Sequence, residues 1–248
     1  MIRILILLIA FCNASSFASE IESNCQVSND IKTNKVTFYI GQSVKNIMSD
    51  KDVQLWISNA INLSNEILSN SCIPLRREVE AIVYIDDINP DYIDNISLTH
   101  IFLESTLNRE LDNSDLTKYY GYVYYLDSNC GLTDASKYPK FFLLNLFCAQ
   151  FTLEHELGHL ATANHDIKTL QSQNYVYTLE IPFSNFKEAT YARGAICDGH
   201  GTIMSYVNPR VFTYSSPDIS LNGHPCGEEN KADNAKVLRS YVRKFYGN

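Results

Sequence analysis

Residues 151–166 read Phe-Thr-Leu-Glu-His-Glu-Leu-Gly-His-Leu-Ala-Thr-Ala-Asn-His-Asp, and the rest of the chain is organised around this stretch. His155 and His159 are four residues apart, which places both imidazoles on the same face of a helix. Two neutral imidazoles in that arrangement can bind one zinc ion. Glu156 follows the first histidine, where its carboxylate can take a proton from a metal-bound water.

His165 lies six residues beyond His159 and is predicted to be the third nitrogen ligand. A continuous helix would carry it away from the metal, so the chain must turn after about residue 161. Three protein ligands leave one position open for water, which is typical of catalytic rather than structural zinc. The five-residue pattern alone would also fit a core helix, and the third histidine argues against that interpretation.

A second segment, Gly201-Thr-Ile-Met-Ser-Tyr206, follows later in the chain. Taken together, the two segments resemble the zinc helix and the methionine turn of the metzincin metalloendopeptidases, and by eye the reprolysin (adamalysin)-like subgroup. Smaller features agree: Asn65 to Ser71 before a strand, Cys130-Gly131 before the zinc helix, and Pro225-Cys226-Gly227 near the end. The resemblance covers roughly residues 36–246 and is specific in the two motifs.

The resemblance implies an α+β fold of the metzincin (zincin) type. A mixed twisted sheet with two long helices would form an upper lobe of about residues 36–165. A smaller, irregular lower lobe of about residues 166–248 would end in a helix, with the substrate cleft between the lobes. The implied activity is that of a zinc metalloendopeptidase with one catalytic Zn²⁺ and a protein or peptide as substrate.

The resemblance also implies roles for residues around the metal. Met204 would form an apolar floor under the histidines. Tyr206 could hydrogen-bond the developing oxyanion or bind zinc at rest, as in astacin and serralysin, or it could be a buried structural tyrosine. Asp166 is expected to accept a hydrogen bond around the ligands. The expected cleft residues are Gly131 and Leu132, and, after the methionine turn, Val207, Asn208 and Pro209.

Thr162 departs from the family pattern, which has glycine where the zinc helix ends. Glycine accepts a left-handed backbone without steric cost, whereas a β-branched residue accepts it badly. We therefore expect either another turn geometry or a left-handed Asn164, since asparagine tolerates that region better.

The N-terminus is predicted to be a processed leader. Arg3 precedes an apolar run from Ile4 to Phe11, and Ser16-Phe17-Ala18 offers a cleavage site, so residues 1–18 read as a signal peptide. The run is too short to span a bilayer. Residues 19–35 are polar and read as an N-terminal extension or a short pro-segment. A secreted or periplasmic protein is expected.

Removal of the leader, with Cys12, leaves six of the seven cysteines. An even number after a signal peptide indicates disulfides in an oxidising compartment. Fifteen pairings are possible in principle. Proximity in sequence favours Cys130–Cys148 and Cys197–Cys226, which leaves Cys25–Cys72.

The composition of the chain limits the kinds of binding partner that are expected. The chain has 248 residues, of which 45% are hydrophobic, and its formal net charge is −8, which suits one compact domain. An acidic chain without a basic run is not expected to bind nucleic acid through phosphates. Neutral or basic substrates are favoured weakly, because net charge says little about one cleft. We expect a monomer, and Asp86-Asp87 offers only weak support for structural calcium.

Local patterns predict the main elements. Strands are expected at 36–40, 79–85, 119–126 and 141–147, and helices at about 50–69, 98–111, 149–161 and 229–245. Two alternatives to the zinc peptidase remain. One is a metzincin-like binding module without catalysis, for which Thr162 is the only support. The other is a gluzincin-type enzyme with a glutamate ligand from a later helix, against which the position of His165 argues.

Overall fold

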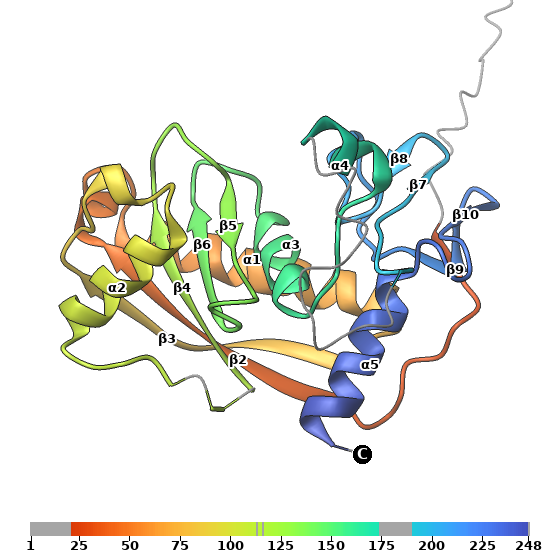
Figure 1. Ribbon diagram of the computed structural model, residues 1–248, viewed down its shortest axis with the longest axis horizontal. Coiled ribbons are helices and arrows are strands. Elements are labelled where there is room, and N and C mark those ends of the chain that lie inside the picture. Colours follow the sequence, from red (N-terminus) through yellow and green to blue (C-terminus); the bar gives the residue numbers. More distant parts are fainter. Residues whose placement is uncertain (1–20, 113, 116, 174–189, 248) are drawn as a thin grey trace, which may run out of the picture.

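A five-stranded sheet with strand order β3-β2-β4-β6-β5 forms the first half of the chain (Figure 1). Its strands are β2 (Lys32–Gly41), β3 (Leu75–Ile85), β4 (Lys118–Tyr124), β5 (Gly131–Thr133) and β6 (Phe141–Asn145). The pairs β2–β3, β2–β4 and β4–β6 are parallel, and only the edge strand β5 runs antiparallel to its neighbour. The expected mixed sheet is therefore present. The computed structural model describes residues 21–112, 114–115, 117–173 and 190–247.

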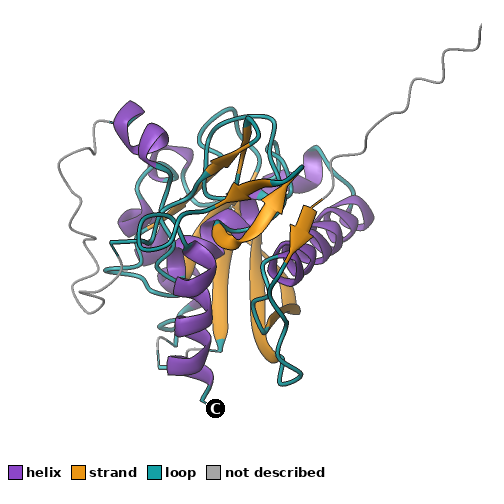
Figure 2. Cartoon of the chain, turned by 90° about the vertical axis from the view of Figure 1, so that its right-hand side faces the viewer, coloured by secondary structure: helices purple, strands orange, loops and turns teal. Residues whose placement is uncertain are grey.

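Helices cover both faces of this sheet, so its central strands are buried (Figure 2). On one face lie α1 (Asp50–Asn70) and α3 (Thr152–Leu160), whose apolar side chains share a core with Phe38 and Phe142. On the other face lies α2 (Ile96–Leu107), against a tyrosine-rich surface of β2 and β4. Ser49 caps α1 by accepting a hydrogen bond from the Asp52 N–H.

Several element bounds differ from the sequence expectation. β2 and β3 each begin four residues early, because parallel pairing starts at Lys32 with Leu75. The expected helix at 98–111 is α2, which ends at Leu107, where Asn108 adopts a left-handed conformation. Helix α3, which carries His155 and His159, has only nine residues, so the expectation of two long helices on the upper sheet is wrong for this one.

The second part of the chain is more regular than expected. A three-stranded sheet of β1 (Ile21–Ser23), β9 (Ser216–Leu221) and β10 (His224–Cys226) lies beside the short pair β7 (Ile196–Cys197) and β8 (His200–Gly201). The 3-10 turns η1 (Gln42–Asn46) and η2 (Pro90–Tyr92) and the short helix α4 (Ile167–Ser172) complete the connections. The chain closes with α5 (Asn234–Tyr246), which begins five residues later than expected, at its cap Asp233 (Figure 1).

The polar N-terminal segment, expected to be an extension or a short pro-segment, pairs with the second part of the chain. β1 pairs antiparallel with β9, residue Ile21 opposite Leu221. Sequence periodicity could not predict this pairing, because a three-residue strand is too short to show a period. The expected signal peptide, residues 1–18, lies outside the described residues, and no described helix is long and apolar enough to cross a membrane.

The three disulfides favoured by sequence proximity are all formed: Cys25–Cys72, Cys130–Cys148 and Cys197–Cys226. The first joins the N-terminal segment to the end of α1, and the second links the start of β5 to the loop that leads into α3. Such bridges are typical of proteins from oxidising compartments.

A buried ion pair connects α3 to the sheet. The guanidinium of Arg77 on β3 binds the carboxylate of Glu154 on α3 through two hydrogen bonds of 3.2 and 3.1 Å, and neither side chain is exposed. Arg77 also donates to Asn34, and the Tyr214 hydroxyl donates to Glu154. Burial opposes the charge of Arg77, but the attraction of Glu154 outweighs it, so the pKa of Arg77 is raised. Glu154 precedes His155, so this pair holds the helix that carries the candidate ligands.

Candidate metal centre

The three histidines singled out by the sequence meet at one point. His155 and His159 come from successive turns of α3, and His165 follows the turn that ends this helix. Their Nε2 atoms lie 3.1 Å (His155–His165), 3.0 Å (His159–His165) and 3.2 Å (His155–His159) apart. All three residues are buried or nearly so.

The other ring nitrogens explain how the imidazoles are oriented. Nδ1 of His155 lies 2.9 Å from the Ile203 carbonyl, and Nδ1 of His159 lies 3.0 Å from the Ala163 carbonyl. Nδ1 of His165 lies 3.0 Å from the side-chain oxygen of Gln173. Each oxygen accepts a hydrogen bond, so each Nδ1 carries the proton and each Nε2 points a lone pair at the centre.

Three converging lone pairs repel one another unless a cation lies between them, so the donor set fits a metal ion. Burial keeps the histidines neutral, as ligands must be: it lowers the pKa of His155 to about 3 and that of His159 well below its usual value. Within the described part of the chain, these are the only three His, Cys, Asp or Glu side chains grouped closely enough to hold a metal. Asp87, named above as weak support for calcium, accepts hydrogen bonds from the backbone N–H and the hydroxyl of Ser43.

The turn between His159 and His165 corrects one expectation. Thr162 itself adopts the left-handed conformation, with φ of 70°, and Asn164 does not take its place. The Thr162 N–H donates to the His159 carbonyl and the Ala163 N–H donates to the Gly158 carbonyl, which is the Schellman pattern of a helix end. Two backbone hydrogen bonds thus impose on threonine a geometry that glycine usually supplies.

Thr162→Gly is expected to raise the free energy of unfolding by about 1 kcal/mol. It removes a steric cost of about 1–2 kcal/mol at the left-handed position and a buried hydroxyl without a hydrogen-bond partner, against the entropy that glycine adds to the unfolded chain. Urea unfolding of both proteins at the same saturating zinc concentration measures the difference. A lower midpoint in the variant would show that the threonine is favourable here.

Glu156 follows the candidate ligand His155 on α3, and its side chain lies against the edge strand β5. It is 5% exposed, and burial raises its pKa to about 8, although a hydrogen bond with Thr133 on β5 acts in the opposite direction. A Cβ atom on Gly131 would lie 2.5 Å from the Glu156 carboxylate. Glycine at position 131 is therefore what lets the carboxylate lie against β5.

Met204 packs against α3, and the ring of Tyr206 lies beside those of His155 and His165. Met204 is fully buried, and a Cβ on Gly158 would lie 2.9 Å from its sulfur, so the thioether packs under the helix between the two ligand turns. The Tyr206 ring centroid lies 4.8 Å from that of His165, and this side chain is 51% exposed. Burial, followed by the charge of Glu156, raises the pKa of Tyr206. A hydrogen bond with Gln173, the residue that also accepts from His165, acts in the opposite direction.

Asp166, expected to accept a hydrogen bond around the ligands, lies directly after His165. It caps α4, accepting from the backbone N–H and the hydroxyl of Thr169. The Thr169 hydroxyl in turn accepts a hydrogen bond from the Tyr206 N–H. Because α4 begins immediately after His165, the carboxylate turns back onto its own helix, and it supports the methionine turn through Thr169.

The expected cleft residues belong to two segments, the edge strand β5 and the segment after the methionine turn. Gly131 and Leu132 form the edge strand β5, which is paired on one side only among the described residues. Val207, Asn208 and Pro209 follow the methionine turn, and Asn208–Pro209 is a cis peptide. The Gly201 N–H donates to the Pro209 carbonyl, which ties this segment to the turn.

Sequence reasoning missed two polar side chains at the site. Gln173, beyond the end of α4, accepts the hydrogen bond from His165. Arg210 donates from Nη1 to the carbonyls of Ile203 and Ser205, the first of which also accepts from His155. Neither lies at a ligand spacing, so no local pattern could have found them.

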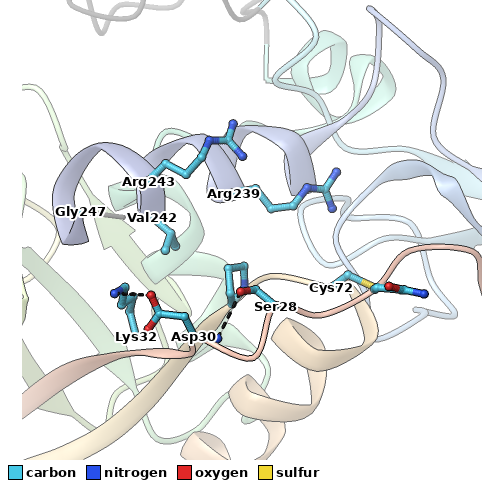
Figure 3. A pocket seen from close by; sticks show the side chains of 10 residues that line it. Ser28, Asp30, Lys32, Cys72, Arg239, Val242, Arg243 and Gly247 are labelled. Atoms are coloured by element: carbon cyan, nitrogen blue, oxygen red, sulfur yellow. Dashed lines mark hydrogen bonds and ion pairs between the residues drawn. The ribbon is translucent and has the colours of Figure 1, made fainter.

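A separate pocket lies between the N-terminal segment and α5 (Figure 3). Its lining includes Lys32, which is paired with Asp30 at 2.6 Å, and the side chains of Arg239 and Arg243. None of the three histidines lines it. The candidate metal centre is therefore distinct from this pocket.

Comparison with known proteins supports the chemistry of the donor set. The chain is 37% identical over 92 residues to a peptidyl-Asp metalloendopeptidase of Stenotrophomonas maltophilia strain K279a, a match that covers 36% of this chain and 20% of the relative. It is 32% identical over 117 residues to a protein of the same name from Xanthomonas campestris pv. campestris, covering 46% and 25%. These relatives are metalloendopeptidases.

The matches are partial, since the chain spans about a fifth to a quarter of the length of these relatives. They support a relationship to metallopeptidases and do not single out the reprolysin-like subgroup. No model of a known protein family matches the chain. A chain in a solved structure of a chaperone–substrate complex superposes with a TM-score of 0.60 at 19% identity, covering 88% of this chain and 40% of that one, which shows a shared fold alone.

Proposed function

We propose that the protein is a zinc-dependent metalloendopeptidase of the metzincin type, in which Glu156 acts as the general base. The observation that carries this proposal is the convergence of three Nε2 lone pairs beside a buried carboxylate. A tetrahedral zinc ion with Zn–N bonds of about 2.05 Å places its nitrogens about 3.3 Å apart. The observed separations of 3.0–3.2 Å come close to that value.

Zinc bound to these histidines would lower the pKa of water to about 7 and polarise a substrate carbonyl. Glu156 would take the proton from the attacking water and later deliver it to the leaving amine. Its burial and its raised pKa suit a group that holds and returns a proton near neutral pH.

The edge strand supports binding of an extended peptide. β5 has backbone groups on its outer side without a strand partner among the described residues, and a peptide chain can add to such an edge through main-chain hydrogen bonds. Gly131 on this strand touches Glu156, so a peptide laid along β5 would bring its scissile bond to the carboxylate. Main-chain recognition favours an endopeptidase.

The substrate and the location follow as parts of the same proposal. The name of the relatives specifies aspartate, and we extend a preference for an acidic residue next to the scissile bond to this chain. Three disulfides support secretion to an oxidising compartment. One chain supplies all three ligands and the base, which supports action as a monomer.

His165→Ala tests the metal centre. It removes one of three ligands, so zinc content after dialysis is expected to fall from one ion per chain to well below that, together with the cleavage of casein. Elemental analysis and a casein assay measure the two quantities on one sample. If zinc stays stoichiometric in the variant, the third ligand is elsewhere, which would favour a site of the gluzincin type.

Tyr206→Phe is expected to reduce kcat for peptide cleavage by about 10²–10³-fold with little change in KM. The hydroxyl near His165 would donate to the oxygen that gains negative charge only in the transition state. Steady-state kinetics with one fluorogenic peptide separates the two constants. An unchanged kcat would return Tyr206 to a structural role.

A further inference from the structure

Arg210 presents a cation beside the metal centre. Its Nη1 lies 3.2 Å from the Ile203 carbonyl, the same oxygen that accepts the hydrogen bond from His155. Its guanidinium carbon lies 4.5 Å above the ring of Phe151, one turn before His155 on α3. Its positive charge also acts to lower the pKa values of Tyr206, His165 and His155.

One edge of this guanidinium has no partner. Nη1 is used by the carbonyls of Ile203 and Ser205, and Nε is buried without a hydrogen-bond partner, whereas Nη2 donates no hydrogen bond to any residue that the structure describes. No carboxylate of the described residues forms an ion pair with Arg210, although the charge of Asp166 acts on it from a longer distance. By contrast, the buried Arg77 uses both edges, one on Glu154. Nη2 of Arg210 can therefore donate a charge-assisted hydrogen bond to a carboxylate from outside.

The backbone that carries Arg210 is held in place. The Gly201 N–H donates to the Pro209 carbonyl, and the Val211 N–H donates to the Gly201 carbonyl, so both neighbours of Arg210 are tied to the methionine-turn segment. Together with the two bonds from Nη1, this anchoring leaves the side chain little freedom. Preorganisation of this kind lowers the entropy lost when a ligand binds.

We propose that Arg210 determines specificity by binding, through Nη2, the side-chain carboxylate of an acidic substrate residue that flanks the scissile bond. The assignment rests on the peptidase function proposed above and deepens it. A half-buried positive charge that has no carboxylate at ion-pair distance is unfavourable, and a substrate carboxylate would supply that partner. The overall net charge of −8 favours neutral or basic substrates. A preference for an acidic residue would therefore come from Arg210 and not from the net charge.

A structural role for Arg210 makes a different prediction. If the guanidinium only holds the carbonyls of Ile203 and Ser205, its loss disturbs the methionine turn and lowers the cleavage of all peptides by the same factor. If it also binds substrate, its loss lowers the cleavage of acidic peptides selectively. The ratio of kcat/KM between matched peptides therefore separates the two roles.

The test uses the zinc-loaded full-length protein and quenched fluorescent peptides that differ only in Asp or Asn, placed on either side of the scissile bond. For the wild type, we expect a kcat/KM ratio of Asp to Asn of about 10 to 100 at one of the two positions, the usual effect of a hydrogen bond to a charged group. A ratio near one at both positions, in a protein that still cleaves casein, would overturn the proposal and leave the peptidase function intact. A zinc-loaded protein that cleaves none of the peptides and no casein would overturn both.

Arg210→Met is expected to reduce the Asp to Asn ratio to about one to three, while cleavage of the Asn peptide continues. Arg210→Lys keeps the charge but lacks the fork, so an intermediate ratio is expected, and it supplies the decisive reading should Arg210→Met fail to fold. Arg243→Met, an exposed arginine on α5, is the matched control and should keep the wild-type ratio. An unchanged ratio in both Arg210 variants would contradict the assignment.

Discussion

Glu156→Gln is expected to lower kcat/KM for peptide hydrolysis by about 10²–10⁴-fold, the usual contribution of general acid–base catalysis. Glutamine has the shape of glutamate and can still accept the hydrogen bond from Thr133, so the space against Gly131 stays filled. Zinc content should remain at one ion per chain, because His155, His159 and His165 are untouched.

The measurement is steady-state cleavage of one fluorogenic peptide, with zinc determined on the same samples. Glu66→Gln is the matched control, because it makes the same chemical change on the exposed side of α1 and should cleave at the wild-type rate. Near wild-type turnover in Glu156→Gln would exclude the carboxylate as the base. Loss of zinc from that variant would instead indicate that Glu156 helps to bind the metal.

Arg77→Met is expected to lower the free energy of unfolding by about 3–5 kcal/mol, because it leaves the buried carboxylate of Glu154 without its cation. The pair is bidentate and inaccessible to water, so no solvent replaces the lost hydrogen bonds. Zinc affinity should fall as well, since Glu154 precedes His155 on α3.

Urea unfolding at a fixed zinc concentration, with disulfides intact, measures this loss. Arg76→Met is the control on the neighbouring residue: its pair with Glu78 spans 3.7 Å and is largely exposed, so the expected change is below about 1 kcal/mol. Equal effects of the two substitutions would contradict the importance of the buried pair. A double variant, Arg77→Met with Glu154→Leu, should recover part of the stability, because two apolar groups leave no buried charge.

The buried ion pair between Arg77 and Glu154 could not be predicted from the sequence. Arg77 and Glu154 are 77 residues apart, and only the tertiary structure brings them together. Arg77 lies just before the strand expected at 79–85, in a stretch rich in charged residues. Burial of one particular arginine depends on which face of the strand meets the helix, and a shift of one residue would reverse it.

The candidate ligands and the base, by contrast, follow from the sequence by itself. The spacing of His155 and His159 is a property of the helix, and the six-residue offset of His165 requires a turn in whatever fold contains it. The disulfide pairings and helix α1 also follow from short-range patterns, because closing short loops costs the least entropy and a cap acts on its own helix.

The tertiary structure alone decided which groups complete the site. Gln173 reaches His165, Asp166 turns to α4, and Arg210 comes to lie beside His155, although none of these contacts follows a period in the chain. Thr162 adopts its left-handed conformation because two backbone hydrogen bonds at the end of α3 outweigh its own preference. Local propensity is worth about 1 kcal/mol per residue, so packing and hydrogen bonds from distant segments override it where they converge.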